Sequence, residues 1–405
     1  MARILSLTAR FPYPPYRGDT RRALHIISHL ASVQEHHLLS FIERDDDVMR
    51  WRVAQMGQIA ASVRTVVLPQ WRSFLNVGLL GYRSLPFQAL YYTSREMREQ
   101  VRQRVEEIKP DVILVHLFRM APYALDLPAP ILVDLTDVIS FEVQNALPYM
   151  RPPKRWAYAL EARRIAAFEN LLARRADAVA LCSQRDASIL RSRVPEAEPV
   201  VVPNVVDTGM FSRDGVTYDP DLIVFCGRLD CRHNEEAVLR FARSIFPKVK
   251  RRRPQARFHL VGMSPSRRVR RLISAGLVTH ESPPAMEDYV RAIQRAAVSV
   301  APLAFAAGTQ CKVLEALAAG VPVITTKVSN DGLGGVPGEH LLVEDDDSRF
   351  AELVTDVLSK PGVRRTLSVN GRKLVEEAFG MGAVAEPLER AVEQAIGRGR
   401  KRLGL

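Results

Sequence analysis

Short apolar runs alternate with longer amphipathic segments along the first half of the chain. The runs predict six strands, near residues 4–7, 37–41, 65–68, 112–115, 131–135 and 178–182. Between them, apolar residues recur at three- and four-residue steps, which predicts helices near 20–31, 94–108 and 154–175. This alternation is typical of parallel α/β architecture.

The second half repeats the alternation. It predicts strands near 222–226, 257–261, 297–301, 321–325 and 340–343, and helices near 235–251, 286–296 and 309–319. We therefore predict two Rossmann-like domains, spanning 1–200 and 201–383, with prolines and glycines marking the boundary region. Residues 384–405 are expected to form a helix that returns to the first domain and ends in a frayed basic tail.

The composition is that of an ordinary globular protein. Of the 405 residues, 47% are hydrophobic and 25% are charged, which excludes a disordered or fibrous chain. The net charge of +12 is compatible with a nucleic acid, an anionic membrane surface or an anionic small ligand as partner, and equally with solvated arginine-rich faces. Basic and aromatic residues do not interleave on one predicted face, so we expect no nucleic-acid partner.

Cysteine and histidine usage bears on compartment and metal content. The four cysteines form no CxxC pair, which favours a reducing compartment without disulfides, and the nine histidines show no zinc-ligand spacing. No apolar run has the length of a membrane span, and the apolar run at the start of the chain is too short for a signal peptide. We expect a cytoplasmic protein, free or bound peripherally to the cytoplasmic face of the inner membrane, with no metal and no cofactor.

A glycine turn follows the first predicted strand. Gly18 and Asp19 precede a predicted helix, and a glycine there lets main-chain N–H groups approach an anion at the helix start. The alternative is a proline-rich turn in which Asp19 or Thr20 caps the helix.

Two further glycine turns follow strands of the second half. Gly308 and Thr309 are expected to open a helix whose positive end faces a diphosphate, with Lys312 near phosphate and Glu315 near ribose hydroxyls. The alternative is a surface ion pair between residues three apart on one helix face. Arg228, after Gly227, would bind a diphosphate at a strand end, or alternatively pair with a surface carboxylate.

These motifs together resemble glycosyltransferase family 4, and within it bacterial enzymes that build exopolysaccharides and other cell-surface glycans. The resemblance rests on 227–229, 308–324, 202–207 and 332–343, and it extends over nearly the whole chain. It implies a GT-B fold, in which two Rossmann-like domains face each other across a cleft. It also implies a retaining, metal-independent hexosyltransferase that moves a sugar from a nucleoside diphosphate donor to a glycan or lipid-linked acceptor.

The resemblance also implies roles for individual residues. The donor would be bound by Gly227, Arg228, Gly308, Thr309, Gln310, Lys312, Val313, Leu314 and Glu315, with Gly18 and Asp19 approaching from the first domain. Catalytic roles fall to Arg228, Lys312, Glu315, His116 and Asp137. Either His116 or Asp137, each at a strand end of the first domain, would face the sugar. The alternatives are a packed histidine and a helix-capping aspartate.

This chain departs from the family pattern at three places, one of which is Val205, where the motif Asn-Gly-Val-Asp usually has its glycine. Ala307 stands where the family has the first of two glutamates, and Cys231 to Glu235 stand where a lysine usually follows the Gly-Arg pair. Two other functions stay open, and the loss of the glutamate favours the second of them. One is a nucleotide-sugar epimerase of GT-B fold, and the other is a degenerate protein that binds nucleotide and only scaffolds an assembly.

One segment mixes aromatic, aliphatic and basic residues. It runs from Trp71 to Arg83 and continues through Phe87 to Tyr92. Such a mixture suits an interfacial loop that meets a lipid-linked acceptor at a membrane surface. The alternative is a core helix and connecting turn of the first domain, because aromatic residues are more often buried.

Overall fold

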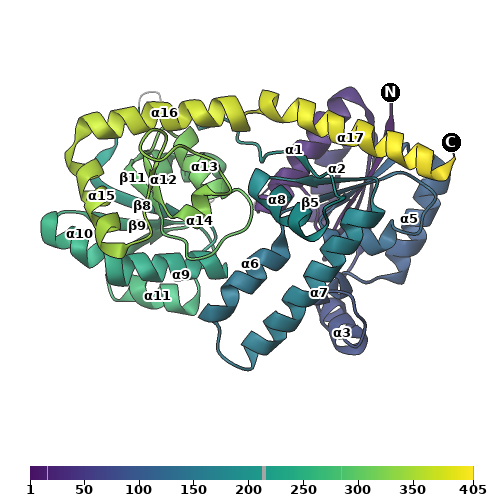
Figure 1. Ribbon diagram of the computed structural model, residues 1–405, viewed down its shortest axis with the longest axis horizontal. Helices are drawn as coiled ribbons and strands as arrows, with labels where there is room; N and C mark the ends of the chain where they lie inside the picture. The colour runs from purple at the N-terminus through teal and green to yellow at the C-terminus, as the bar shows by residue number, and fades with distance from the viewer. Residues whose placement is uncertain (16, 212–215, 284, 405) are drawn as a thin grey trace. The chain divides into compact units, whose positions relative to one another are not determined.

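The protein is described by a computed structural model that covers residues 1–15, 17–211, 216–283 and 285–404. The chain divides into two compact units. The amino-terminal unit comprises Met1–Pro203 with Val384–Leu405, and the carboxyl-terminal unit comprises Asn204–Ala383. Each unit contains its own parallel sheet flanked by helices (Figure 1). This confirms the predicted α/β class with two Rossmann-like domains.

The amino-terminal unit is built on a seven-stranded parallel sheet in the order β3-β2-β1-β4-β5-β6-β7. Its strands are β1 (Arg3–Thr8), β2 (Glu35–Ile42), β3 (Ser62–Val67), β4 (Val112–His116), β5 (Ile131–Thr136), β6 (Ala178–Leu181) and β7 (Val200–Val201). The strand order reverses between β1 and β4. In open α/β sheets, ligands bind outside the carboxyl ends of the strands at such a switch point.

The helices of this unit agree with the amphipathic pattern where that pattern is long. They are α1 (Gly18–Val33), α2 (Asp47–Gly57), α3 (Gln70–Leu80), α4 (Phe87–Tyr91), α5 (Arg95–Ile108), η1 (Phe118–Tyr123), α6 (Ile139–Ala146), η2 (Leu147–Tyr149), α7 (Lys154–Arg175), α8 (Gln184–Arg193) and α17 (Met381–Leu403). Ser94 and Ser183 cap α5 and α8 by accepting main-chain N–H bonds, which explains where those helices begin.

The frayed basic tail predicted for the carboxyl terminus is wrong. The last helix, α17, continues to Leu403 and runs along the amino-terminal unit in yellow in Figure 1. Arg402 donates from Nε and Nη2 to Asp177 at 2.9 Å, and Arg398 pairs with Glu198. Gly399 lies so close to Pro130 that a Cβ there would stand 2.4 Å from the proline Cβ. Ion pairs and close packing therefore hold the basic residues in a helix.

The carboxyl-terminal unit contains a six-stranded parallel sheet in the order β10-β9-β8-β11-β12-β13. Its strands are β8 (Asp219–Cys226), β9 (Arg257–Val261), β10 (Thr279–Glu281), β11 (Ala296–Ala301), β12 (Val323–Thr325) and β13 (Leu342–Val343). The switch point lies between β8 and β11. The glycine turns after these two strands, at Gly227 and Gly308, therefore belong to the edge where a ligand is expected.

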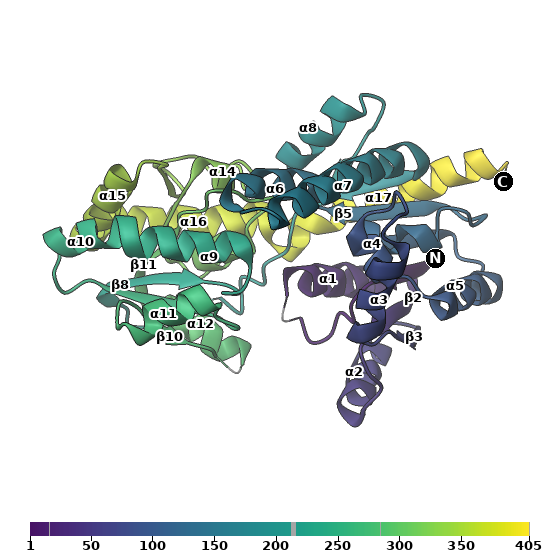
Figure 2. The ribbon, with the colours of Figure 1, turned by 90° about the horizontal axis from the view of Figure 1, so that it is seen from below.

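Helices cover both faces of this second sheet. They are α9 (Arg232–Arg240), η3 (Phe241–Ile245), α10 (Phe246–Arg252), α11 (Arg267–Ser274), α12 (Met286–Gln294), α13 (Cys311–Ala318), α14 (Lys327–Asn330), α15 (Asp347–Ser359) and α16 (Pro361–Phe379). The single helix predicted at 235–251 is interrupted by the π-helical turn η3. Figure 2 shows α9 and α10 as one nearly continuous helical run through this turn. Among the described residues, no helix is both long and apolar enough to cross a membrane.

Candidate functional site

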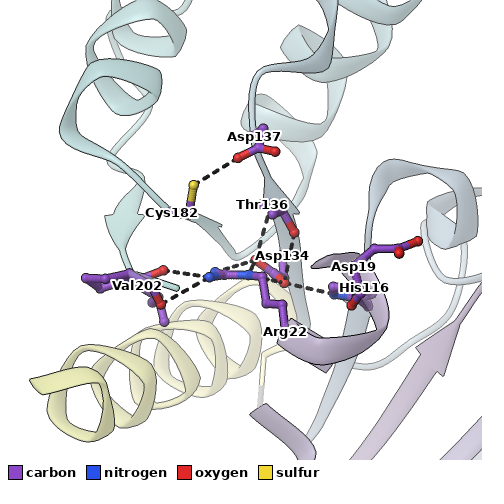
Figure 3. A network of polar contacts seen from close by, with 9 residues as sticks. Asp19, Arg22, His116, Asp134, Thr136, Asp137, Cys182 and Val202 are labelled. Carbon is purple, nitrogen blue, oxygen red and sulfur yellow. Dashed lines mark hydrogen bonds and ion pairs between the residues drawn. The ribbon is translucent and has the colours of Figure 1, made fainter. Parts of the chain in front are cut away.

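Three buried ionisable side chains meet at the carboxyl ends of the strands in the amino-terminal unit (Figure 3). Arg22 comes from α1, His116 ends β4, and Asp134 lies in β5. They are 5%, 4% and 1% exposed. Arg22 Nη2 lies 2.8 Å from Asp134 Oδ1, and its Nε lies 3.0 Å from Oδ2, which is the two-pronged geometry that suits guanidinium and carboxylate.

Arg22 also contacts the segment that leads from the amino-terminal unit into the rest of the chain. Arg22 Nη1 donates to the main-chain oxygens of Val202 at 2.8 Å and Pro203 at 3.2 Å. Burial alone would raise the pKa of Asp134, but the charges of Arg22 and His116 outweigh it and lower that pKa. Asp134 therefore stays ionised, and the network depends on every member being present.

His116 uses both of its ring nitrogens inside the protein. Nδ1 lies 2.9 Å from Asp134 Oδ2, and Nε2 lies 3.0 Å from the main-chain oxygen of Asp19. A carboxylate and a carbonyl oxygen both accept, so His116 faces an acceptor at each of its ring nitrogens. In this arrangement His116 ties β4 to the first turn of α1, as the packed-histidine alternative predicts.

Asp19 lies among arginine side chains. Its carboxylate pairs with Arg10, and burial, which alone would raise its pKa, is outweighed by the charges of Arg10, Arg119 and His116, which lower it. Asp19 does not cap α1. Instead Thr20 Oγ1 accepts from the main-chain N–H of Arg17 at 3.1 Å, so the capping alternative is correct for Thr20 alone. Gly18 is the first residue of α1.

Asp137 is not part of this network. Figure 3 shows it turned toward Cys182, whose Sγ–H donates to Asp137 Oδ1 at 2.9 Å, and away from His116. Burial and the nearby charge of Asp186 raise the pKa of Asp137 to about 7. The structure therefore does not bring together the two first-domain residues that the sequence nominated.

Asp137, Cys182 and Asp186 are the one group of described residues whose side chains converge as metal ligands do. Their contacts are directed elsewhere. Asp186 accepts from Ser183 Oγ and from the main-chain N–H of Val138 at 3.0 Å, and burial raises the pKa of the Cys182 thiol well above its usual value. All three side chains are therefore engaged with protein partners, and we base no proposal on this group.

The backbone is strained beside the buried network. Leu117 follows His116 with φ of 64°, and Thr136 ends β5 with φ of 65°. Residues other than glycine are uncommon in this region, and strained positions cluster at functional sites. The two residues lie at the carboxyl ends of neighbouring strands, which marks this edge as the candidate site of the unit.

The carboxyl-terminal unit places its candidate residues around the start of α13. Gly308 and Thr309 do not open this helix as predicted, since it begins at Cys311 after Gln310. They form the turn before it, where Gly308 has a left-handed φ of 56°. The turn is tightly packed, because a Cβ on Gly332 would lie 1.9 Å from the Gly308 oxygen. Thr309 and Gly308 therefore precede the first helical residue, Cys311, by two and three positions.

Lys312 is buried against a glycine. Its Cε lies 3.4 Å from where a Cβ of Gly227 would stand, and its Nζ donates to Gln310 Oε1 at 2.7 Å. Burial lowers the pKa of Lys312. The two glycine turns of this unit are thus joined through one lysine, and any side chain at Gly227 would press on it.

Glu315 is buried as well, and Tyr289 donates its hydroxyl hydrogen to Glu315 Oε2 at 2.6 Å. The alternative of a surface ion pair between Lys312 and Glu315 is therefore wrong, since neither side chain is on the surface. Val313 and Leu314 pack in the core of the unit. Their packing fixes the position of α13, the helix that carries Lys312 and Glu315.

Arg228 pairs with Asp230, and its Nε lies 3.0 Å from Asp230 Oδ1. The two side chains are 27% and 39% exposed, which is the arrangement that the carboxylate-pairing alternative predicts. Asn234 donates from Nδ2 to the Arg228 main-chain oxygen at 2.8 Å. Arg22, Asn234 and Tyr289 were missed by sequence reasoning. Only Asn234 had a signal, because it lies in the stretch that departs from the family pattern.

Residues 21–209 match the family profile described as Glycosyltransferase Family 4, and residues 220–360 match the profile described as Glycosyl transferases group 1. No curated protein matches the chain.

Solved structures share the fold over nearly the whole chain. Sucrose-phosphate synthase from Thermosynechococcus elongatus is 16% identical with a TM-score of 0.71, covering 98% of this chain and 99% of that one. Anabaena HepE, in complex with UDP-glucose, is 14% identical with a TM-score of 0.65, covering 97% and 100%. A mutant of TarM from S. aureus, in complex with UDP, is 8% identical with a TM-score of 0.67, covering 97% and 100%.

The likeness to solved structures shows the GT-B fold, and the matches to the family profiles show the family as well. The two matched ranges lie one in each unit apart from the residues at the boundary, and together they take in most of the chain. They contain the buried network of the amino-terminal unit and the lysine-centred site of the carboxyl-terminal unit. The chain therefore belongs to glycosyltransferase family 4 and is a glycosyltransferase.

Proposed function

We propose that this enzyme is a retaining hexosyltransferase that takes its sugar from a nucleoside diphosphate donor. The acceptor is a glycan or a lipid-linked glycan in the assembly of a bacterial cell-surface polysaccharide, at the cytoplasmic face of the inner membrane. The observation that carries the proposal is the burial of Lys312 against Gly227 at the switch point of the carboxyl-terminal sheet. That HepE has been solved with UDP-glucose supports testing uridine donors first.

The donor diphosphate would complete the charge balance around Lys312. Burial lowers the pKa of this lysine, and a diphosphate beside it would stabilise the ammonium form. Arg228 can join by leaving Asp230, because a partly exposed ion pair contributes little to stability. Glu315, oriented by Tyr289, would accept hydrogen bonds from the hydroxyl groups of the ribose. Gly227, Gly308 and Thr309 would let the main chain come close to the phosphates.

Catalysis would rest on electrostatic stabilisation of the leaving diphosphate. Negative charge develops there as the bond to the sugar breaks, and fixed cations in a dry site stabilise it without reorganisation. Lys312 and Arg228 supply that charge, which removes the need for a metal. In a front-face reaction the departing phosphate oxygen takes the acceptor proton, so the new bond forms on the face that the donor leaves.

A product analysis of donor turnover tests the proposal. Proton magnetic resonance would follow the enzyme with UDP-glucose, ADP-glucose and GDP-mannose, first without acceptor. The slow release of α-sugar and free nucleoside diphosphate is expected for one donor, and it should be lost in Lys312→Ala and kept in Lys360→Ala. Lys360 is the matched control because it is exposed and pairs with Asp356. Release of β-sugar would contradict retention, and an altered sugar still attached to the nucleotide would show an epimerase.

A nucleotide-binding scaffold is the second candidate, and Ala307 favours it. This residue stands where the family has a glutamate, and its main-chain oxygen accepts from Gln310 Nε2 at 2.7 Å. The buried site has no acidic side chain at that position to hold a sugar hydroxyl. Binding of a nucleoside diphosphate without turnover of any sugar donor would support the scaffold and contradict the transferase.

A further inference from the structure

Helix α3 exposes its apolar side chains. Its eleven residues are all described, and Ser73 is the one that is buried. Trp71 is 65% exposed, Phe74 is 67% exposed and Leu79 is 72% exposed. The second part of the predicted segment, α4, agrees with the core-helix alternative, because Leu90 and Tyr92 are buried. The first part, α3, is neither the loop nor the core helix that the sequence left open. It is a surface helix with its apolar side toward solvent.

A second aromatic group extends this surface. Tyr149 and the first turns of α7 expose Trp156, Tyr158 and Leu160, with Trp156 at 69%. The two parts are connected, because Arg164 of α7 donates to the main-chain oxygen of Gly81 at 2.9 Å. The aromatic face is defined here as Trp71, Phe74, Leu75, Leu79, Tyr82, Tyr149, Trp156, Tyr158 and Leu160, all of them exposed.

The elements that carry the aromatic face lie on one side of the amino-terminal unit. Figure 1 shows α3 and the turn between α6 and α7 at the lower edge of that unit, and Figure 2, seen from below, shows both α3 and α7 in view. Chain connectivity agrees. Helix α3 follows β3 and α6 follows β5, so both leave the sheet from the carboxyl edge, where His116 and Asp134 lie.

The two stretches of chain that carry the aromatic face contain basic but no acidic residues, although Glu43, from outside them, accepts from Gln70 at the start of α3. No aspartate or glutamate occurs between Asp47 and Glu96, or between Glu142 and Glu161. Within these stretches the exposed cations near the face are Arg72, Arg83, Arg151, Lys154 and Arg155. The face therefore combines tryptophan, tyrosine and aliphatic side chains with arginine and lysine.

We propose that the aromatic face docks the enzyme on an anionic lipid bilayer. Tryptophan and tyrosine favour the headgroup level, aliphatic side chains favour the acyl boundary, and nearby cations are attracted to anionic headgroups. A second copy of the chain is a poorer occupant, because two such cationic faces would repel each other. The inference deepens the proposed function, on which it rests for the acceptor. An enzyme held at the bilayer by this edge meets a lipid-linked acceptor at the end of the sheet that carries its candidate site.

Vesicle flotation of the full chain tests the inference. The wild-type protein is expected to float with vesicles of phosphatidylcholine mixed with phosphatidylglycerol at low salt, and weakly with phosphatidylcholine alone. The variant Trp71→Ser/Phe74→Ser/Leu79→Ser should lose binding about tenfold or more, since it removes the apolar insertion. Arg72→Glu/Arg83→Glu should lose it in a salt-dependent manner. The matched control is Arg251→Glu, an exposed cation in the carboxyl-terminal unit.

Two further readouts make the outcomes distinct. Because the changed side chains are exposed, circular dichroism and the melting temperature should match the wild type. Nucleotide binding without vesicles should also be unchanged, so a failure of the donor site would appear there and not in flotation. Wild-type protein that ignores anionic vesicles, or a triple variant that floats equally well, would overturn the inference. The inference would also be overturned if the wild-type protein were a dimer in solution and the triple variant a monomer.

Discussion

The imidazole of His116 joins the end of β4 to the start of α1, since its Nε2 lies 3.0 Å from the main-chain oxygen of Asp19. The other ring nitrogen contacts Asp134, which Arg22 holds in turn. One histidine therefore connects the first helix to two neighbouring strands at the switch point of the sheet. The family resemblance nominated His116 for sugar contact, and the structure adds that it orders the turn around Gly18 and Asp19.

Replacing His116 with alanine should destabilise the amino-terminal unit. The change leaves Asp134 and the Asp19 carbonyl each without one hydrogen bond, and unsatisfied buried acceptors cost about 1–3 kcal/mol. Urea unfolding of the full chain measures the loss. His116→Gln, which can donate one bond, should recover part of it. Equal stability of all three proteins would show that the contacts contribute nothing.

Removing Arg22 should be more damaging, because it strands a buried carboxylate. Breaking a buried ion pair from one side costs about 3–5 kcal/mol. Arg22→Met should show a loss of this size in urea unfolding, and Arg22→Met/Asp134→Asn should be less affected than the single variant. Arg50→Met is the control. Arg50 pairs with Asp47 in an exposed position, and such pairs contribute little to stability. A loss in Arg22→Met no larger than in the control would contradict the role of this network.

Asp137 predicts a pH dependence of stability. Burial, together with the charge of Asp186, raises its pKa in the folded protein to about 7, above the value in the unfolded chain. The folded state then binds more protons between the two pKa values, so the free energy of unfolding falls as pH rises from about 4 to 7. Asp137→Asn removes this dependence. Its stability relative to the wild type should increase by about 1–3 kcal/mol between pH 5 and pH 8. A constant difference between the two proteins would show that Asp137 is not protonated in the fold.

Sugar transfer should not require a divalent metal. Lys312 and Arg228 carry the positive charge at the proposed diphosphate site, and no carboxylate pair was identified there as a ligand set among the described residues. We therefore expect the rate of donor turnover to be the same with and without EDTA. Loss of turnover in EDTA that Mn²⁺ or Mg²⁺ restores would contradict this.

Long periodic elements could be predicted from the sequence, and short or irregular ones could not. The helix predicted at 154–175 is α7, Lys154–Arg175, because its apolar positions persist over many turns. The strand β10, Thr279–Glu281, was missed because three residues carry too little pattern. The π-helical turn at Phe241–Ile245 leaves the apolar periodicity nearly intact, so nothing in the pattern marks it.

The candidate site shows the same division. The glycine turns at Gly227 and Gly308 could be predicted because each lies in a short local sequence motif. The pairing of Arg22 with Asp134 could not, since the two residues lie 112 positions apart and only the folded sheet brings them together. The exposure of Trp71 and Phe74 could not be predicted from the sequence either. An apolar helix has the same sequence pattern whether its apolar side meets a core or a bilayer.

Calorimetric titration with a nucleoside diphosphate bears on the whole proposal, because donor binding at Lys312 underlies it. UDP is the first ligand to use. The wild-type protein is expected to bind it saturably at one site. Lys312→Ala and Arg228→Ala should each weaken binding by about 1.5–3 kcal/mol, the range for a hydrogen bond to a charged group, while Lys360→Ala should not. Affinity that is unchanged in both site variants, or a folded wild-type protein that binds none of UDP, ADP and GDP, would contradict the proposal.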